Sequence, residues 1–198
     1  MKWAAALICL AATASAEGFL PTYQVTEVSA DDVLNIRAEP DPQADIVGTY
    51  DPYVQHIEVL RTSPDGMWGL VGVAEQNGWT AMRFLEEMQH PADSILRPLH
   101  CFGTEPFWSL ELFLRGDAYH AFGDTRRTLT QVSERLASNG AIAVFEEGPS
   151  LTRTLIVERG YCDDGMRDRE FGMRATLFND TPDGSTVQSG CCTGDASR

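Results

Sequence analysis

Hydrophobic and polar residues alternate in short runs through the first half of the chain, a pattern typical of β-strands with one buried face. Turn sequences such as Pro64-Asp65-Gly66 and Gln76-Asn77-Gly78 separate several of these runs. The expected strands are residues 23–28, 33–37, 46–50, 56–61, 68–73 and 78–82. Short strands at this spacing predict a small β-barrel over residues 23–87, after a short lead-in at residues 17–22.

The second half also alternates, and its runs are longer and more strongly β-like. Arg115-Gly116-Asp117 is expected to turn residues 108–114 back along residues 118–122 as a hairpin. Further strands are expected at residues 129–132, 141–145, 152–159, 171–178 and 187–190. About seven such strands predict an antiparallel barrel or sandwich over residues 99–192, followed by a flexible tail at 193–198. The chain is therefore expected to be all-β.

Residues 88–98 separate the two patterns and have no sustained period of their own. Pro91 and Pro98 stand near the ends of this segment. Proline removes a backbone donor and favours extended neighbours, so the segment is interpreted as a linker. Because it carries little apolar surface, we expect the two halves to fold independently.

The N-terminus has the composition of a secretory signal peptide. Lys2 precedes an apolar run over residues 3–12, and Thr13-Ala14-Ser15-Ala16 resembles the small-residue cleavage site of such a peptide. The run is shorter than the roughly 20 residues of a transmembrane helix, so no membrane insertion is expected. The pattern predicts an exported protein, periplasmic or secreted, beginning near Glu17.

The formal net charge of −14, from 15 basic and 29 acidic residues, narrows the classes of partner. A chain this acidic repels phosphate backbones and anionic lipid surfaces, so nucleic-acid and membrane-surface binding are disfavoured.

Four cysteines lie beyond the predicted signal: Cys101, Cys162 and the adjacent pair Cys191 and Cys192. In an exported chain this pattern indicates two disulfides. A bond between neighbours would be strained, so Cys101 and Cys162 each pair with one of the adjacent cysteines, in either combination. In a strand, neighbouring side chains point to opposite faces, so one bridge should be buried and the other nearer solvent. A metal or redox site that also uses His100 is the alternative, but no Cys-x-x-Cys spacing supports it, and no metal or cofactor is expected.

The acidic run Asp163-Asp164-Gly165-Met166-Arg167-Asp168-Arg169 invites comparison with a calcium loop. It lacks alternating oxygen ligands and a distal glutamate. A turn with local Asp–Arg pairs is the preferred interpretation.

The first half resembles the bacterial SH3-like domain in four separated elements. They are Leu34-Asn35-Ile36-Arg37-Ala38-Glu39-Pro40, Ile46-Val47-Gly48, Gly66-Met67-Trp68-Gly69-Leu70-Val71 and Asn77-Gly78-Trp79. The resemblance covers about a third of the chain and implies a small barrel that binds peptidoglycan, peptides or an envelope protein and rarely performs chemistry. One departure is Thr80, which follows the last tryptophan where the family usually has a hydrophobic residue.

This resemblance suggests candidate ligand-binding residues. Tyr50, Tyr53, Trp68 and Trp79 would line an aromatic groove. The alternative is that Trp68 and Trp79 fill the barrel, as large side chains do in small barrels. Arg37 would either contact the ligand or act as scaffold by pairing with a nearby acidic residue (Asp31, Asp32 or Glu39).

The second half resembles a family of uncharacterised bacterial envelope proteins and lipoproteins. The matching segments are Gly103-Thr104-Glu105-Pro106-Phe107-Trp108, Cys162-Asp163-Asp164-Gly165-Met166-Arg167-Asp168 and Gly190-Cys191-Cys192. Phe171-Gly172-Met173 departs from the aromatic-Pro-aromatic run that usually follows the second segment. This resemblance implies a location in the envelope and carries no activity to transfer.

Three functions are compatible with these patterns. The preferred one is an exported, non-enzymatic binding module for peptidoglycan, a peptide or an envelope protein, with Glu105 as a further candidate contact. The second is a small cell-wall hydrolase using Glu105, Asp164 and Asp168 as acid and base, although no catalytic motif supports it. The third is an inhibitor of such a hydrolase, which would present a protruding loop near Glu105 or Met166.

Overall fold

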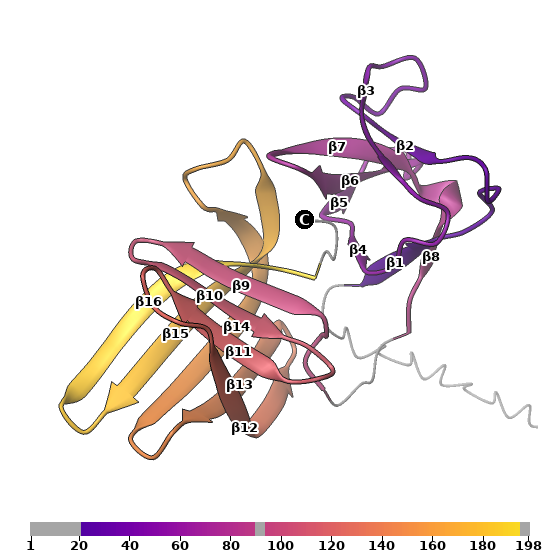
Figure 1. The fold of residues 1–198 in the computed structure, drawn as a ribbon. Helices are drawn as coiled ribbons and strands as arrows, with labels where there is room; N and C mark the ends of the chain where they lie inside the picture. Colours follow the sequence, from indigo (N-terminus) through magenta and orange to yellow (C-terminus); the bar gives the residue numbers. More distant parts are fainter. Residues whose placement is uncertain (1–20, 90–93, 195–198) are drawn as a thin grey trace, which may run out of the picture.

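A computed structural model describes residues 21–89 and 94–194, which form two all-β halves lying side by side (Figure 1). The predicted signal peptide, residues 1–16, lies outside the described residues, as does most of the lead-in. Within the described ranges, no helix has the length and apolar character needed to cross a membrane.

The N-terminal half consists of two small sheets that share one core. Its strands are β1 (Thr22–Val25), β2 (Leu34–Arg37), β3 (Ile46–Tyr50), β4 (Ile57–Glu58), β5 (Arg61–Thr62), β6 (Trp68–Val73), β7 (Gln76–Ala81) and β8 (Leu85–Glu87). One sheet has the order β4-β1-β8 and the other the order β3-β2-β7-β6-β5. Apolar residues from both sheets, including Val25, Ile36, Ile57 and Val71, pack together between them. This packing explains the alternation, because each strand buries one face.

One expected turn in this half is wrong. β6 and β7 are joined by Ala74 and Glu75, and Gln76-Asn77-Gly78 already belongs to β7. Ala74 has a φ of 47°, in the left-handed region that tight hairpins require. The Asn-Gly dipeptide is a strong turn signal, but here Asn77 is paired in the ladder and its side chain contacts the other half of the protein.

The C-terminal half is a closed eight-stranded antiparallel barrel. Of the two folds that the sequence left open, the barrel is therefore the correct one and the sandwich is not. Its strands are β9 (Leu99–Thr104), β10 (Phe107–Leu112), β11 (Asp117–Ala121), β12 (Arg127–Ala137), β13 (Gly140–Glu147), β14 (Leu151–Asp163), β15 (Glu170–Thr181) and β16 (Gly184–Thr193). Each strand pairs with the next, and β16 pairs with β9 to close the barrel. β9 was not among the expected strands, because Gly103 interrupts its short alternating pattern.

Apolar side chains fill the barrel, as expected for eight strands. Ile95 and Leu96 are part of this core, although residues 88–98 were interpreted as a linker. They are followed by Arg97, which forms an ion pair of 3.1 Å with Glu134 on β12. The last part of the connecting segment therefore belongs to the barrel. The sequence does not indicate this, because two apolar residues alone form no regular period.

Two disulfides join the strands around β16. Cys101 and Cys192 lie opposite each other on β9 and β16, and both are buried in the barrel core. Cys162 bonds to Cys191 on the outer side of the barrel, where the pair packs against Phe171. The prediction of two disulfides on opposite faces of one strand is confirmed, and the pairing left open by the sequence is resolved.

Specific polar contacts connect the two halves. The side-chain amide of Asn77 accepts a hydrogen bond from the N–H of Glu170 (2.6 Å) and donates one to its carbonyl oxygen (3.3 Å). The carboxylate of Glu170 also forms an ion pair with Arg61. At a second, buried contact, the Thr193 hydroxyl donates to Glu58 (2.6 Å). These contacts fix the arrangement of the halves, whereas their independent folding stays a prediction.

Candidate functional site

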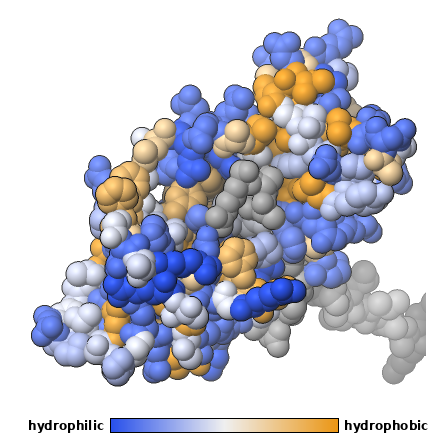
Figure 2. Space-filling view, in the orientation of Figure 1, coloured by the Kyte–Doolittle hydropathy of each residue, from blue (hydrophilic) through white to orange (hydrophobic). Residues whose placement is uncertain are grey.

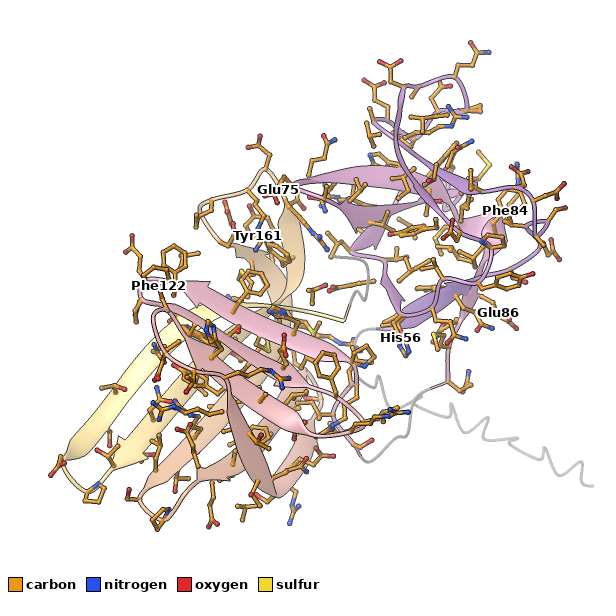
Figure 3. The ribbon with its side chains drawn as sticks, in the orientation of Figure 1. His56, Glu75, Phe84, Glu86, Phe122 and Tyr161 are labelled. Carbon is orange, nitrogen blue, oxygen red and sulfur yellow. A yellow bond between two sulfur atoms is a disulfide. The ribbon has the colours of Figure 1, made fainter. Side chains whose placement is uncertain are left out.

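A cleft with a volume of about 550 Å³ lies at the junction of the two halves. The β6–β7 turn forms one wall, the outer face of the β9–β10 hairpin forms the floor, and the loop between β14 and β15 forms the second wall. Glu75, labelled in Figure 3, belongs to the first wall. Arg167 and Arg169 both line this space, and we call it the arginine cleft.

The loop between β14 and β15 is organised by one buried carboxylate. Asp164 accepts hydrogen bonds from the backbone N–H groups of Met166 (3.0 Å) and Arg167 (3.1 Å), and from Nε of Arg167 (2.7 Å). Burial alone would raise the pKa of Asp164, but these hydrogen bonds and the Arg167 charge outweigh it and hold the pKa below its usual value. Gly165 supplies the positive φ, 70°, that the turn requires. The expected turn with a local Asp–Arg pair is present here, and it fixes the base of the Arg167 side chain.

Arg167 is held against two aromatic rings. Its guanidinium lies 4.9 Å from the ring centre of Phe102 and 5.2 Å from that of Phe171. The two rings are themselves packed edge to face at 5.0 Å. Nε bonds to Asp164, but within residues 21–89 and 94–194 neither Nη atom of Arg167 has a hydrogen-bond partner. Arg167 therefore presents two oriented donors to the cleft, the arrangement with which guanidinium groups bind carboxylates.

Arg169 has a different role in the same loop. Its side chain is buried, and its guanidinium lies against the backbone of Gly72, where a Cβ atom would not fit. It donates to the carbonyl oxygen of Ala74 (3.4 Å) and stacks over Phe171 at 5.1 Å. Arg169 thus links the loop to the N-terminal half and closes one side of the cleft. Two carboxylates, Glu75 and Asp164, line the cleft together with the two arginines.

Trp108 and two glycines support the floor of the cleft. Trp108 is buried and pairs with Gly103 across the β9–β10 ladder. A Cβ atom at Gly103 would overlap the indole nitrogen, and one at Gly190 would lie 3.0 Å from the indole ring and overlap the backbone of Phe102. The indole therefore occupies space that side chains at these positions would fill. Two of the segments singled out in the sequence, residues 103–108 and 162–168, contribute side chains to this cleft, and Cys191 of the third segment is bonded to Cys162.

The three candidate catalytic carboxylates have different surroundings. Glu105 is exposed at the turn between β9 and β10, and Asp168 is exposed beside Gln76 of the N-terminal half. Asp164 is committed to the loop, and its lowered pKa is opposite to the shift that a general acid needs. In the described part of the chain, no group of three or more His, Cys, Asp or Glu side chains is arranged to hold a metal ion.

The aromatic candidates of the N-terminal half do not form one groove. Tyr50 belongs to the core, 3% exposed, and its hydroxyl donates to a backbone carbonyl of β6 (3.3 Å). Tyr53 is 77% exposed and apart from that core. Trp68 and Trp79 are half-buried on the face of β6 and β7 opposite to Val71, which points into the core. Tyr50 is thus a structural residue, while both tryptophans stay on the outer surface instead of filling the interior.

Arg37 has a structural role in this arrangement. Its Nη1 donates to the carbonyl oxygen of Ala44 (2.6 Å) and so closes the loop between β2 and β3. Arg37 also lies opposite Trp79 in the sheet. The ion pairs expected with Asp31, Asp32 or Glu39 are not among the salt bridges of the described residues.

The sequence reasoning missed the residues that make the cleft distinctive, Phe102, Phe171 and the two arginines. Their types were visible, but Arg167 and Arg169 were assigned to an ordinary turn. Phe102 lies opposite Cys191 on β16, and Phe171 lies opposite Cys162 on β14. These neighbours lie on other strands, so the local pattern around each phenylalanine indicates only a strand. A scan against protein-family models finds no match to the chain, and no curated protein or solved structure matches it significantly.

Proposed function

We propose that this protein is an exported binding module of the cell envelope, and that the arginine cleft holds an anionic group of its ligand. The ligand class is a peptide, the peptide part of peptidoglycan, or an envelope protein. The observation that carries the proposal is the position of Arg167, fixed by Asp164 and stacked on Phe102 and Phe171. A cation fixed in this way loses little side-chain entropy when it binds a carboxylate.

The net charge of the chain limits how many negative groups the ligand can carry. A net charge of −14 repels polyanions, so the ligand that suits the cleft has one negative group, or few. A charge-assisted hydrogen bond to a partly buried guanidinium contributes about 1.5–3 kcal/mol. That is sufficient to select a carboxylate at one position without attracting nucleic acid.

The resemblance of the first half to SH3-like domains supports a docking role for this half. Trp68 and Trp79 lie on its outer surface, half-buried, and large aromatic side chains of this kind are frequent in binding surfaces. The N-terminal half would therefore contribute twice, through this surface and through the β6–β7 turn that forms one wall of the cleft.

The proposal is tested by co-sedimentation of the mature protein with purified peptidoglycan and by capture from an envelope extract. Arg167→Gln should reduce retention at least fivefold, and retention of the natural protein should fall with added salt. Arg135→Gln is the matched control, because Arg135 is exposed on β12 and lines no part of the cleft. Equal retention of both variants would contradict the proposal, and release of soluble fragments from peptidoglycan would favour the hydrolase instead.

A further inference from the structure

We propose that the arginine cleft is one end of a longer groove that binds the extended C-terminal segment of a peptide, with the terminal carboxylate on Arg167. This inference rests on the proposed binding function and specifies its ligand. It concerns a second cavity, of about 710 Å³, which lies around the start of β9 and the end of β10. We call this space the distal cavity.

The two cavities are neighbours on the same surface. His100 and Thr193 line both of them, so the spaces meet at this point. The distal cavity continues to His56 of the N-terminal half and to Phe113 and Leu114 beyond β10. Figure 3 shows His56 near one end of β9 and Phe122 near the other. Phe122 contacts Phe107, which lines the arginine cleft. The combined groove therefore follows the length of β9.

The length of β9 sets the size of the ligand. β9 contains six residues, and an extended strand rises about 3.3 Å per residue, so the groove is about 20 Å long. An extended peptide of about six residues has the same length. The barrel is closed and β9 is paired on both sides, so the peptide cannot add to a free strand edge. Recognition must therefore depend on side chains.

Exposed apolar side chains lie at both ends of this groove. Leu114 is 88% exposed at the distal cavity, while Phe107 and Met166 are 47% and 65% exposed at the arginine cleft. Phe122 is also exposed and packs beside Phe107, with ring centres 6.0 Å apart. Figure 2 shows further exposed apolar groups over the N-terminal half, where Ile46 and Met67 are 54% and 62% exposed. Exposed apolar groups around a cavity are typical of a surface that contacts a partner.

The charges give the peptide its direction. Both arginines form ion pairs, Arg167 through Nε with Asp164 (2.7 Å) and Arg126, at the distal cavity, through Nη2 with Glu111 (2.8 Å). Among the described residues, only the pairing of Arg167 leaves both of its Nη groups without a hydrogen-bond partner. Glu75 and Asp164 also line the arginine cleft, so a second negative charge on the ligand would be repelled. A single carboxylate at the end of an otherwise apolar or basic segment fits this pattern. The chain would then run from Leu114 toward Arg167 and end there.

A glycan strand fits the groove less well than a peptide. Sugar hydroxyls need many polar partners, whereas Leu99, Phe113 and Leu114 form an apolar part of the distal cavity, beside polar residues such as Glu111 and Arg126 that already pair with each other. In the arginine cleft, Phe102 and Phe171 pack on each other and on Arg167, so their ring faces are not free platforms.

The test uses two pools of random hexapeptides, one with free C-terminal carboxylates and one amidated, together with the corresponding pools of tripeptides. Retention on the immobilised full-length mature protein is measured by mass spectrometry. The free-acid hexapeptides should be retained at least fivefold more than the amidated ones, and Arg167→Gln should abolish this difference. Leu114→Asp should reduce retention of the hexapeptides at least threefold and leave the tripeptides unchanged. Val132→Asp is the control, because Val132 is also an exposed apolar residue but lies on β12 outside both cavities.

The outcomes separate this inference from the proposed function. If Arg167→Gln weakens capture of peptidoglycan or an envelope protein while free-acid and amidated pools behave alike, the C-terminal groove is wrong and the binding function stands. If tripeptides bind as well as hexapeptides and Leu114→Asp has no effect, the groove does not extend beyond the arginine cleft. Competition by peptide-free glycan strands, with no retention of either pool, would also overturn the inference.

Discussion

Replacing Gly103 by alanine tests whether the indole of Trp108 is packed on β9 as the structure shows. A Cβ atom at this position would overlap the Trp108 indole nitrogen and lie 2.5 Å from the carbonyl oxygen of Ser189. Ordinary non-bonded contact begins near about 3.5 Å, so the obstruction is on the order of 1 Å. Ser189 is paired with Thr176 in the β15–β16 ladder, so its carbonyl cannot move away alone.

Overpacking of a core costs about 1–3 kcal/mol, and we expect the upper value because one of the obstructing groups is backbone. In a protein of this size, about 3 kcal/mol corresponds to a decrease in Tm of roughly 6–12 °C. The assay is thermal unfolding of the oxidised protein, followed by circular dichroism. The same substitution in a Trp108→Leu background should cost at least about 1 kcal/mol less, because the indole is gone. A Tm for Gly103→Ala within about 1 °C of the natural protein, or an equal cost in both backgrounds, would refute this account of the packing.

Three further predictions concern stability. Trp108→Ala should destabilise the protein by about 3–5 kcal/mol in urea unfolding, through the cavity it leaves, whereas Glu105→Gln, at an exposed turn, should change stability by less than about 0.5 kcal/mol. The pKa of Asp164 is lower in the folded state than its unfolded value of 3.8, so its stabilising effect is present above about pH 4 and is lost as the pH falls through the folded pKa. Asp164→Asn should therefore lower the urea midpoint at pH 7, and the difference from the natural protein should shrink as the pH falls through the folded pKa, whereas a constant difference would contradict this. Asn77→Ala should increase limited proteolysis between the halves without changing the circular dichroism spectrum, and an unchanged rate would show that its contacts with Glu170 do not hold the halves together.

The sequence pattern predicted those parts of the fold that depend on one-sided burial. Residues 46–50 and 68–73 were expected to be strands and coincide with β3 and β6. The same reasoning placed the neighbouring cysteines Cys191 and Cys192 on opposite faces of a strand. A two-residue period follows directly from the pleat, so these features need no information from distant residues.

The arginine cleft was not predictable in this way, because it is assembled from distant segments. Glu170 contacts Asn77 from 93 positions away, and nothing local to either residue indicates the contact. Asn77 also shows how a local signal can mislead, because its Asn-Gly sequence is usual for turns but here lies within β7. Phe102 and Arg167 likewise look like an ordinary strand residue and an ordinary turn residue until the barrel closes and brings them together.

The two adjacent cysteines couple oxidative folding to the register of β16. Cys192 faces Cys101 inside the barrel, and Cys191 faces Cys162 outside it. Exchanging the partners would require β16 to present its opposite face, and a slip by one residue turns every side chain of a strand over. A mispaired isomer would therefore expose the inner residues of β16 and leave the barrel unclosed. The Cys-Cys sequence therefore allows both disulfides to form together only when β16 has the register of the closed barrel.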